Sequence, residues 1–145
     1  MVHALHEARL VLRNGGTLVD LRPFACKPSI EVVTSEEAVA VGTLDDSASI
    51  HDDVAADHAM NQVIESGWFI PSRETVFEME RYWDSVKEMK AFLDTRRHKI
   101  YVSPAYAELE KIHLNRSDRA RGMARLRCRQ PAKLAVLMKP AFLKT

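Results

Sequence analysis

Glycine and cysteine are scarce in this chain, and each shortage excludes a class of site. The 145 residues include five glycines, and none of these form a G-x-G-x-G run or a phosphate-binding P-loop. Cys26 and Cys128 lie far apart, form no C-x-x-C pair, and combine with the six histidines in no zinc-site spacing. We therefore expect no metal site, and we expect free thiols in a reducing, cytoplasmic compartment.

Long apolar runs and catalytic signatures are missing as well. No hydrophobic stretch approaches the roughly 18 residues of a membrane helix, which argues against a membrane partner. There is no nucleophile elbow, no Ser-His-Asp arrangement and no H-E-x-x-H motif. Hydrophobic residues make up 46% and charged residues 28% of the chain, as in globular proteins, and the length suits a single domain over residues 1–145.

The net charge of +1 conceals a strong asymmetry along the chain. Residues 31–94 hold 15 acidic and 4 basic side chains, whereas residues 111–145 hold 10 basic and 1 acidic. Opposite charges of this size attract each other, either within one subunit or across a dimer. The acidic half also argues against the broad basic surface that nucleic acid requires.

The order of hydrophobic patterns predicts an α+β (incomplete α/β) domain with a mostly antiparallel sheet and about four helices. Turn residues and β-branched runs predict strands at residues 17–23, 29–34 and 38–44. Two further strand segments, 68–70 and 74–83, are predicted on either side of Pro71. The chain is predicted to end in a hairpin of strands 124–129 and 133–139 that turns near Pro131. Apolar spacing predicts helices near the N-terminus and at residues 50–66, 86–97 and 104–114, with capping boxes at Ser49–Asp52 and Ser85–Glu88.

The N-terminal helix, the turn at residues 11–16 and the strand at residues 17–23 resemble a unit of class I S-adenosylmethionine-dependent methyltransferases. In that family a helix ends in a Leu-Arg-Pro-Gly-Gly-like turn before the fifth strand of a Rossmann-like sheet; Asn14 stands here where proline is usual. Residues 52–57 and 82–89 extend the resemblance. It implies the C-terminal half of such an enzyme, without the N-terminal glycine-rich cofactor loop, so no catalytic or cofactor residue carries over.

Three arginines of the last hairpin form one candidate site. Arg125, Arg127 and Arg129 alternate with other residues, so on a strand they share one face at spacings of about 7 Å. One interpretation is a strip that binds an anionic ligand such as phosphate. The other, which we favour, is a cross-strand ladder with carboxylates such as Glu78 and Glu80.

Two further sets of residues are candidates for ligand binding. Aromatic side chains gather between residues 68 and 92, where they would line a pocket for a small apolar ligand or simply form the core: Trp68, Phe77, Tyr82 and Trp83. Asp20 and Arg22 lie near the end of the first strand, where parallel α/β sheets bind ligands; a local salt bridge is the alternative.

The strand at residues 17–21 leads to the functional hypothesis. In the resembling family it is flanked by strands that this sequence lacks, and an unpaired apolar edge favours association, most simply as a homodimer. We therefore expect an accessory or ligand- and protein-binding protein that needs no cofactor and is not catalytic on its own. The alternative is a methyltransferase fragment whose S-adenosylmethionine site is completed by a partner chain or across a dimer.

Overall fold

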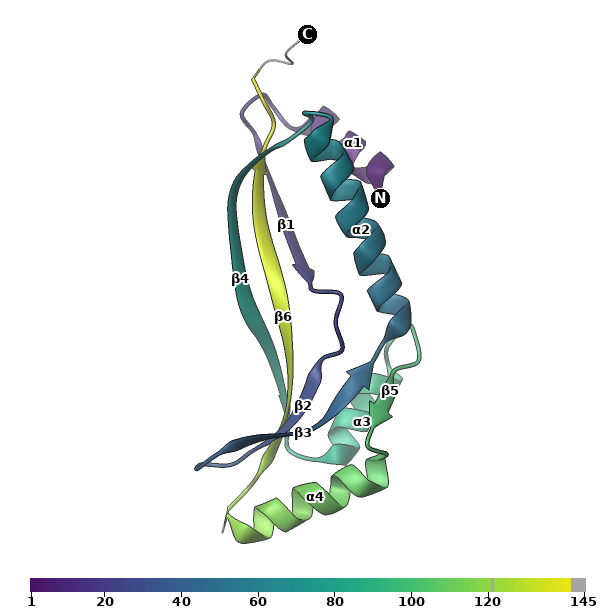
Figure 1. Ribbon diagram of the computed structural model, residues 1–145, viewed down its shortest axis with the longest axis vertical. Coiled ribbons are helices and arrows are strands. Elements are labelled where there is room, and N and C mark those ends of the chain that lie inside the picture. Colours follow the sequence, from purple (N-terminus) through teal and green to yellow (C-terminus); the bar gives the residue numbers. More distant parts are fainter. Residues whose placement is uncertain (121, 142–145) are drawn as a thin grey trace. The chain divides into compact units, whose positions relative to one another are not determined.

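The computed structural model describes residues 1–120 and 122–141 (Figure 1). The helices in this part of the chain are α1 (Val2–Val11), α2 (Ser47–Glu65), α3 (Val86–Asp94) and α4 (Tyr106–Arg119). The strands are β1 (Thr17–Pro23), β2 (Ser29–Val33), β3 (Ala38–Asp45), β4 (Ile70–Trp83), β5 (Tyr101–Ser103) and β6 (Arg125–Met138). The strands follow the order β1-β6-β2-β3-β5, with β4 also pairing β6, and the registers of the β1–β6, β2–β3, β2–β6 and β3–β5 pairs are antiparallel. The α+β class with an antiparallel sheet and four helices is confirmed.

The chain divides into two compact units, and each is described by itself. Unit 1 contains residues 1–25, 50–77 and, as far as they are described, 132–141; unit 2 contains residues 26–49 and 78–131 apart from 121. The long strands β4 and β6 contribute residues to both units. That residues 1–145 form one domain stays a prediction.

Unit 1 is built on the pairing of β1 with the second half of β6. Leu18 lies opposite Leu137, and both pack on the helix side of the sheet with Leu5 of α1 and Val63 of α2. Since successive strand residues point to opposite faces, the residues next to Leu18 and Leu137 along each strand lie on the other side of the sheet.

The turn after α1 contains Gly15 at φ +74°, a backbone conformation that glycine adopts without strain. The Lys139 ammonium donates to carbonyl oxygens at the end of α1 and just beyond it, which satisfies helix-terminal acceptors.

Unit 2 is built on β2, which lies between β6 and β3. Ile30, Val32 and Leu126 are fully buried and meet Met89 of α3 and Leu109 of α4 in one core. The predicted hairpin of residues 29–34 and 38–44 is confirmed by the antiparallel pairing of β2 with β3. The predicted cap of α3 is also confirmed, because the Ser85 hydroxyl accepts the N–H of Glu88 at 3.1 Å.

Several boundaries differ from the sequence-based prediction. β4 is one continuous strand through Pro71, and β6 is one continuous strand through Pro131, so the predicted final hairpin is wrong. Pro131 falls between Arg129, the last residue that pairs with β2, and Ala132, the first that pairs with β1. Its missing N–H therefore costs no bond in the ladders with these two strands. Pro71 is the second residue of β4, which pairs on one side with β6. A proline is tolerated at the beginning of such an edge strand, because its missing N–H can face the unpaired side.

The cap of α2 also differs from the prediction. The helix begins at Ser47 rather than Ile50, and Asp46, not Ser49, accepts the backbone N–H at the third helical position. An aspartate at this place satisfies one of the free amides of the first turn and suits the positive end of the helix. The start of α2 is therefore one turn earlier than the capping-box pattern indicates.

Candidate functional site

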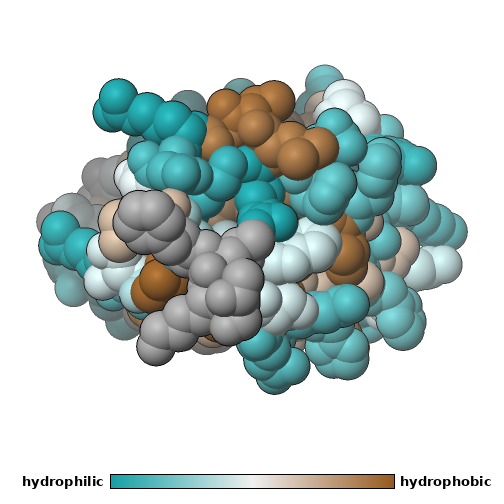
Figure 2. Space-filling view, turned by 90° about the horizontal axis from the view of Figure 1, so that it is seen from above, coloured by the Kyte–Doolittle hydropathy of each residue, from teal (hydrophilic) through white to brown (hydrophobic). Residues whose placement is uncertain are grey.

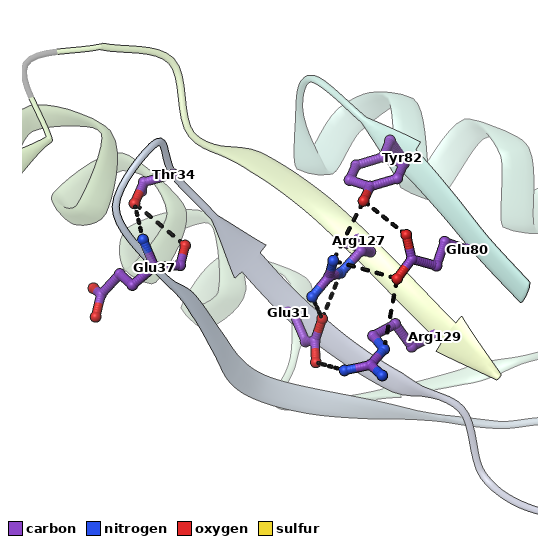
Figure 3. Close-up of polar contacts among 7 residues, drawn as sticks. All are labelled: Glu31, Thr34, Glu37, Glu80, Tyr82, Arg127 and Arg129. Atoms are coloured by element: carbon purple, nitrogen blue, oxygen red, sulfur yellow. Dashed lines mark hydrogen bonds and ion pairs between the residues drawn. The ribbon is translucent and has the colours of Figure 1, made fainter. Parts of the chain in front are cut away.

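The principal polar cluster of unit 2 lies on one face of its sheet (Figure 3). Arg127 and Arg129 project from β6, Glu31 from β2, and Glu80 and Tyr82 from β4. Glu31 lies opposite Arg127 in the strand register and accepts its Nε–H at 2.6 Å, while Arg129 Nη1 lies 3.3 Å from the second Glu31 oxygen. Glu80 Oε1 lies 3.3 Å from Arg127 Nη1 and 3.7 Å from Arg129 Nε, and Glu80 Oε2 accepts the Tyr82 hydroxyl at 2.9 Å. We call these five residues the arginine–glutamate ladder.

The ladder is electrically balanced, and its central pair, Glu31 and Arg127, is largely shielded from water. Only 10% of the Glu31 side chain and 15% of the Arg127 side chain are exposed. The Tyr82 hydroxyl, which accepts a hydrogen bond from Arg127, contributes most to a raised pKa of this guanidinium; Glu31 adds to the effect, and burial opposes it. Two carboxylates and two guanidiniums cancel, so the ladder presents no net charge to an anion.

The favoured ladder with Glu80 is thus present, and Glu31 is the partner that sequence reasoning missed. The signal for Glu31 was a single charge inside the β-branched run of β2, at a position where the strand is otherwise buried. Arg125, the third arginine of the pattern, pairs outside the ladder. Its Nε lies 2.7 Å from Asp84 Oδ1, and its guanidinium lies 5.0 Å from the centre of the Tyr82 ring. Anion binding by these arginines stays a prediction.

Asp20 and Arg22 form a closely paired group in unit 1. Arg22 donates to both carboxylate oxygens of Asp20 at 2.8–2.9 Å, and its Nη1 lies 3.0 Å from Asp57 of α2. Burial is the largest single influence on Arg22 and lowers its pKa, but the two aspartates together outweigh it and raise the pKa. Lys133 of β6 lies 4.0 Å from Asp57 and 3.8 Å from Glu74. The local salt bridge is therefore present, and a ligand role for Asp20 and Arg22 stays a prediction.

The four candidate aromatic residues have different surroundings. Trp83 is buried in the core of unit 2, with its ring 5.6 Å from that of Phe92, as the core interpretation expects. Tyr82 belongs to the arginine–glutamate ladder. In unit 1, Trp68 packs against the core beneath the Arg9 guanidinium at 5.4 Å, and Phe77 is 38% exposed. An apolar ligand pocket at these residues stays a prediction.

Unit 1 also has a sheet face that its helices leave open. Val19 and Leu21 of β1 are 58% and 55% exposed, and Met138 of β6 is 40% exposed. The register places Val19 opposite Val136 and Leu21 opposite Leu134, so these five apolar side chains share the face away from α2. We call them the open face. Figure 2, seen from above, shows hydrophobic residues in small groups set among hydrophilic ones.

A hollow of about 330 Å³ in unit 2 was not predicted. Polar side chains from the start of α2 and from the turn after α3 line it: Asp46, Ser49, Thr95, Arg96, Arg97 and His98. The available signal was the basic run Arg96-Arg97-His98-Lys99 at the end of a predicted helix. The run stands out because it directly follows the acidic stretch of residues 31–94.

Cys26 and Cys128 form no disulfide, and burial raises the pKa of the Cys128 thiol to about 11, so this thiol stays protonated at neutral pH. Within residues 1–120 and 122–141, no group of three or more His, Cys, Asp or Glu side chains could hold a metal ion. In the same described part, no helix is both long and apolar enough to cross a membrane.

Comparison of the chain with family models, with curated proteins and with solved structures found no match. The resemblance to class I methyltransferases therefore rests on the residue pattern of the N-terminal helix, the Gly15-Gly16 turn and β1.

Proposed function

We propose that this chain is a methyltransferase-like accessory protein that binds other molecules, acts as a homodimer and is not catalytic on its own. The observation that carries the proposal is the combination of a free strand edge with the open face. Within residues 1–120 and 122–141, β1 pairs with β6 alone, so its other edge has unpaired backbone donors and acceptors. Such an edge is a template for pairing with another strand.

A comparison with β4 supports β1 as the interacting edge. β4 also forms an edge of the sheet, but along its length it carries several charged side chains that discourage pairing: Arg73 and Glu74 in unit 1, and Glu78, Glu80 and Arg81 in unit 2. The two charges of β1, Asp20 and Arg22, neutralise each other on the helix side of the sheet. Val19 and Leu21, which alternate with them, offer apolar surface instead.

A second copy of the chain fits this edge because two antiparallel β1 strands around a two-fold axis are self-complementary. The register centred on Leu21 places Leu21 against its own counterpart, and it places Asp20 of each copy opposite Arg22 of the other. Cross-strand pairs of this kind each contribute about 0.2–1 kcal/mol. The open faces of the two copies would then form one continuous apolar surface.

Analytical ultracentrifugation across a wide concentration range tests the homodimer. We expect the unmodified chain to sediment as a dimer and Leu21→Lys to sediment as a monomer, because a lysine at this position brings two like charges together. Leu114→Lys is the matched control: Leu114 is 56% exposed on α4, so the variant adds the same charge away from β1 and should stay dimeric. A monomer at every concentration would refute the homodimer.

The free edge of β1 also supports the alternative of a methyltransferase completed by a partner chain. A Rossmann-like sheet would continue on this edge, so a partner that supplies further strands and a glycine-rich loop could pair there. Calorimetric titration with S-adenosylhomocysteine separates the two proposals. Micromolar binding by the chain would refute the accessory role, whereas no binding at millimolar ligand supports it. Cys26 and Cys128 form no disulfide, which supports a cytoplasmic location for either function.

A further inference from the structure

The hollow of unit 2 combines a suitable size with an excess of positive charge, since two arginines and one aspartate line it. Its volume of about 330 Å³ lies at the lower end of the range of small-ligand pockets, roughly 300–1,000 Å³. The turn after α3 supplies Thr95, Arg96, Arg97 and His98, and the beginning of α2 supplies Asp46 and Ser49. All six residues belong to unit 2.

Three of the lining residues are already engaged within the protein. Asp46 accepts the backbone N–H of Ser49 at 3.2 Å and its hydroxyl at 2.5 Å. The Thr95 hydroxyl donates to the carbonyl oxygen of Phe92 at 2.7 Å. Each oxygen of these groups still has a lone pair, so they can accept hydrogen bonds from a ligand but offer no further donor.

The donors of the hollow are the basic groups. In the described residues, the side chains of Arg97 and His98 make no hydrogen bond or ion pair, and Arg96 contacts only the Phe92 ring, 5.6 Å from its guanidinium. Four of the other arginines of the same unit, but not Arg81 and Arg119, are paired with carboxylates at 2.6–3.3 Å in the described residues: Arg116, Arg125, Arg127 and Arg129. The turn after α3 therefore gathers guanidinium groups that the protein does not neutralise.

We propose that this hollow binds a small phosphorylated polyol or sugar. Two guanidiniums and an imidazole supply more donors than the two oxygens of a carboxylate can accept, whereas the terminal phosphate of a monoester has three oxygens and about two negative charges. The guanidinium fork matches phosphate geometry. Asp46, which also lines the hollow, accepts hydrogen bonds only and so favours a ligand with hydroxyl groups beyond its phosphate. The hollow is larger than a phosphate ion and leaves room for such a group.

An NMR titration of the full chain with glycerol 3-phosphate tests the proposal through backbone amide shifts. We expect saturable shifts confined to residues 46–49 and 95–98. Arg97→Gln should weaken binding about tenfold, because it removes one bidentate donor pair from an exposed turn. Arg119→Gln is the matched control: it removes the same charge from an exposed residue of α4 that does not line the hollow, so the affinity should not change.

Two further probes separate the parts of the proposal. Sodium chloride at equal ionic strength should leave these amides unshifted, and inorganic phosphate should bind more weakly than glycerol 3-phosphate. Shifts that do not saturate at millimolar ligand, or an unchanged affinity in Arg97→Gln, would overturn the phosphate site. Equal binding of inorganic phosphate would overturn the polyol specificity. The amide spectrum of Arg97→Gln also reports whether the variant keeps its fold.

Discussion

The arginine–glutamate ladder makes a quantitative prediction about stability. Replacing Arg127 by valine removes the guanidinium that lies 2.6 Å from Glu31, while valine still suits a β-strand. The Glu31 side chain is only 10% exposed, so its carboxylate cannot recover the lost hydrogen bonds fully from water. The variant tests whether the ladder stabilises unit 2 or is a surface feature.

The expected loss follows from the partners that remain. Breaking a buried ion pair by removing one partner costs about 3–5 kcal/mol. Glu31 keeps Arg129, whose Nη1 lies 3.3 Å away, so we expect a smaller loss in the free energy of unfolding for Arg127→Val, about 2 kcal/mol. Glu31→Val should cost about 1 kcal/mol, because Arg127 keeps Glu80 and the Tyr82 hydroxyl.

Urea denaturation followed by Trp83 fluorescence measures this loss, in a Trp68→Phe background so that the signal reports unit 2. Arg125→Val is the control, since Arg125 and its partner Asp84 are half exposed and such pairs contribute about 1 kcal/mol or less. The double variant Glu31→Val with Arg127→Val should be more stable than the additive sum by about 1 kcal/mol or more. Equal losses for Arg125→Val and Arg127→Val, or strict additivity, would refute the reasoning.

Two further predictions concern close packing and an inert thiol. A Cβ on Gly42 would lie 2.2 Å from the backbone oxygen of Ser103, so Gly42→Ala should lower the midpoint of thermal unfolding; Gly122→Ala, whose Cβ meets ordinary contact at 3.7 Å, should not. Burial raises the pKa of the Cys128 thiol to about 11 in the folded state. The protonated thiol therefore contributes its full stabilisation of the fold below the unfolded pKa near 9, and this contribution is lost as the pH rises through 11. Cys128→Val should therefore flatten the alkaline loss of stability, and native Cys128 should react slowly with a disulfide reagent at neutral pH; rapid reaction of both thiols would contradict this.

Local patterns predicted the elements that short-range chemistry determines. The β2–β3 hairpin follows from two β-branched runs joined by a short polar turn, and the start of α3 follows from Ser85 and Glu88. The prolines misled the prediction, because their effect depends on whether the neighbouring strand needs a donor there. Pro131 falls where β6 changes partners from β2 to β1, and the sequence holds no local sign of that change.

The polar clusters, too, were predicted only where local alternation determines them. The alternation of Arg125, Arg127 and Arg129 predicted their common face, and Glu80 as a partner followed from the alternation in β4. Glu31 is 96 residues from Arg127 in the chain, and only the pairing of β2 with β6 brings the two together. The basic hollow escaped prediction for a related reason, since it needs the turn after α3 to meet the beginning of α2.

The acidic and basic parts of the sequence form ion pairs with each other within one chain. In unit 2, acidic residues of the first two thirds pair with basic residues of the last third: Glu31 and Glu80 with Arg127, Glu37 with Arg116, and Asp84 with Arg125. The attraction therefore needs no second copy in this unit, and a dimer must draw its stability from apolar contacts and backbone pairing instead. β1 and the open face, where charges are already neutralised, are therefore the surface to which the proposed association belongs. Arg96 and Arg97 stand out because they directly follow the acidic stretch of residues 31–94 and, in the described part of the chain, take no part in this ion pairing.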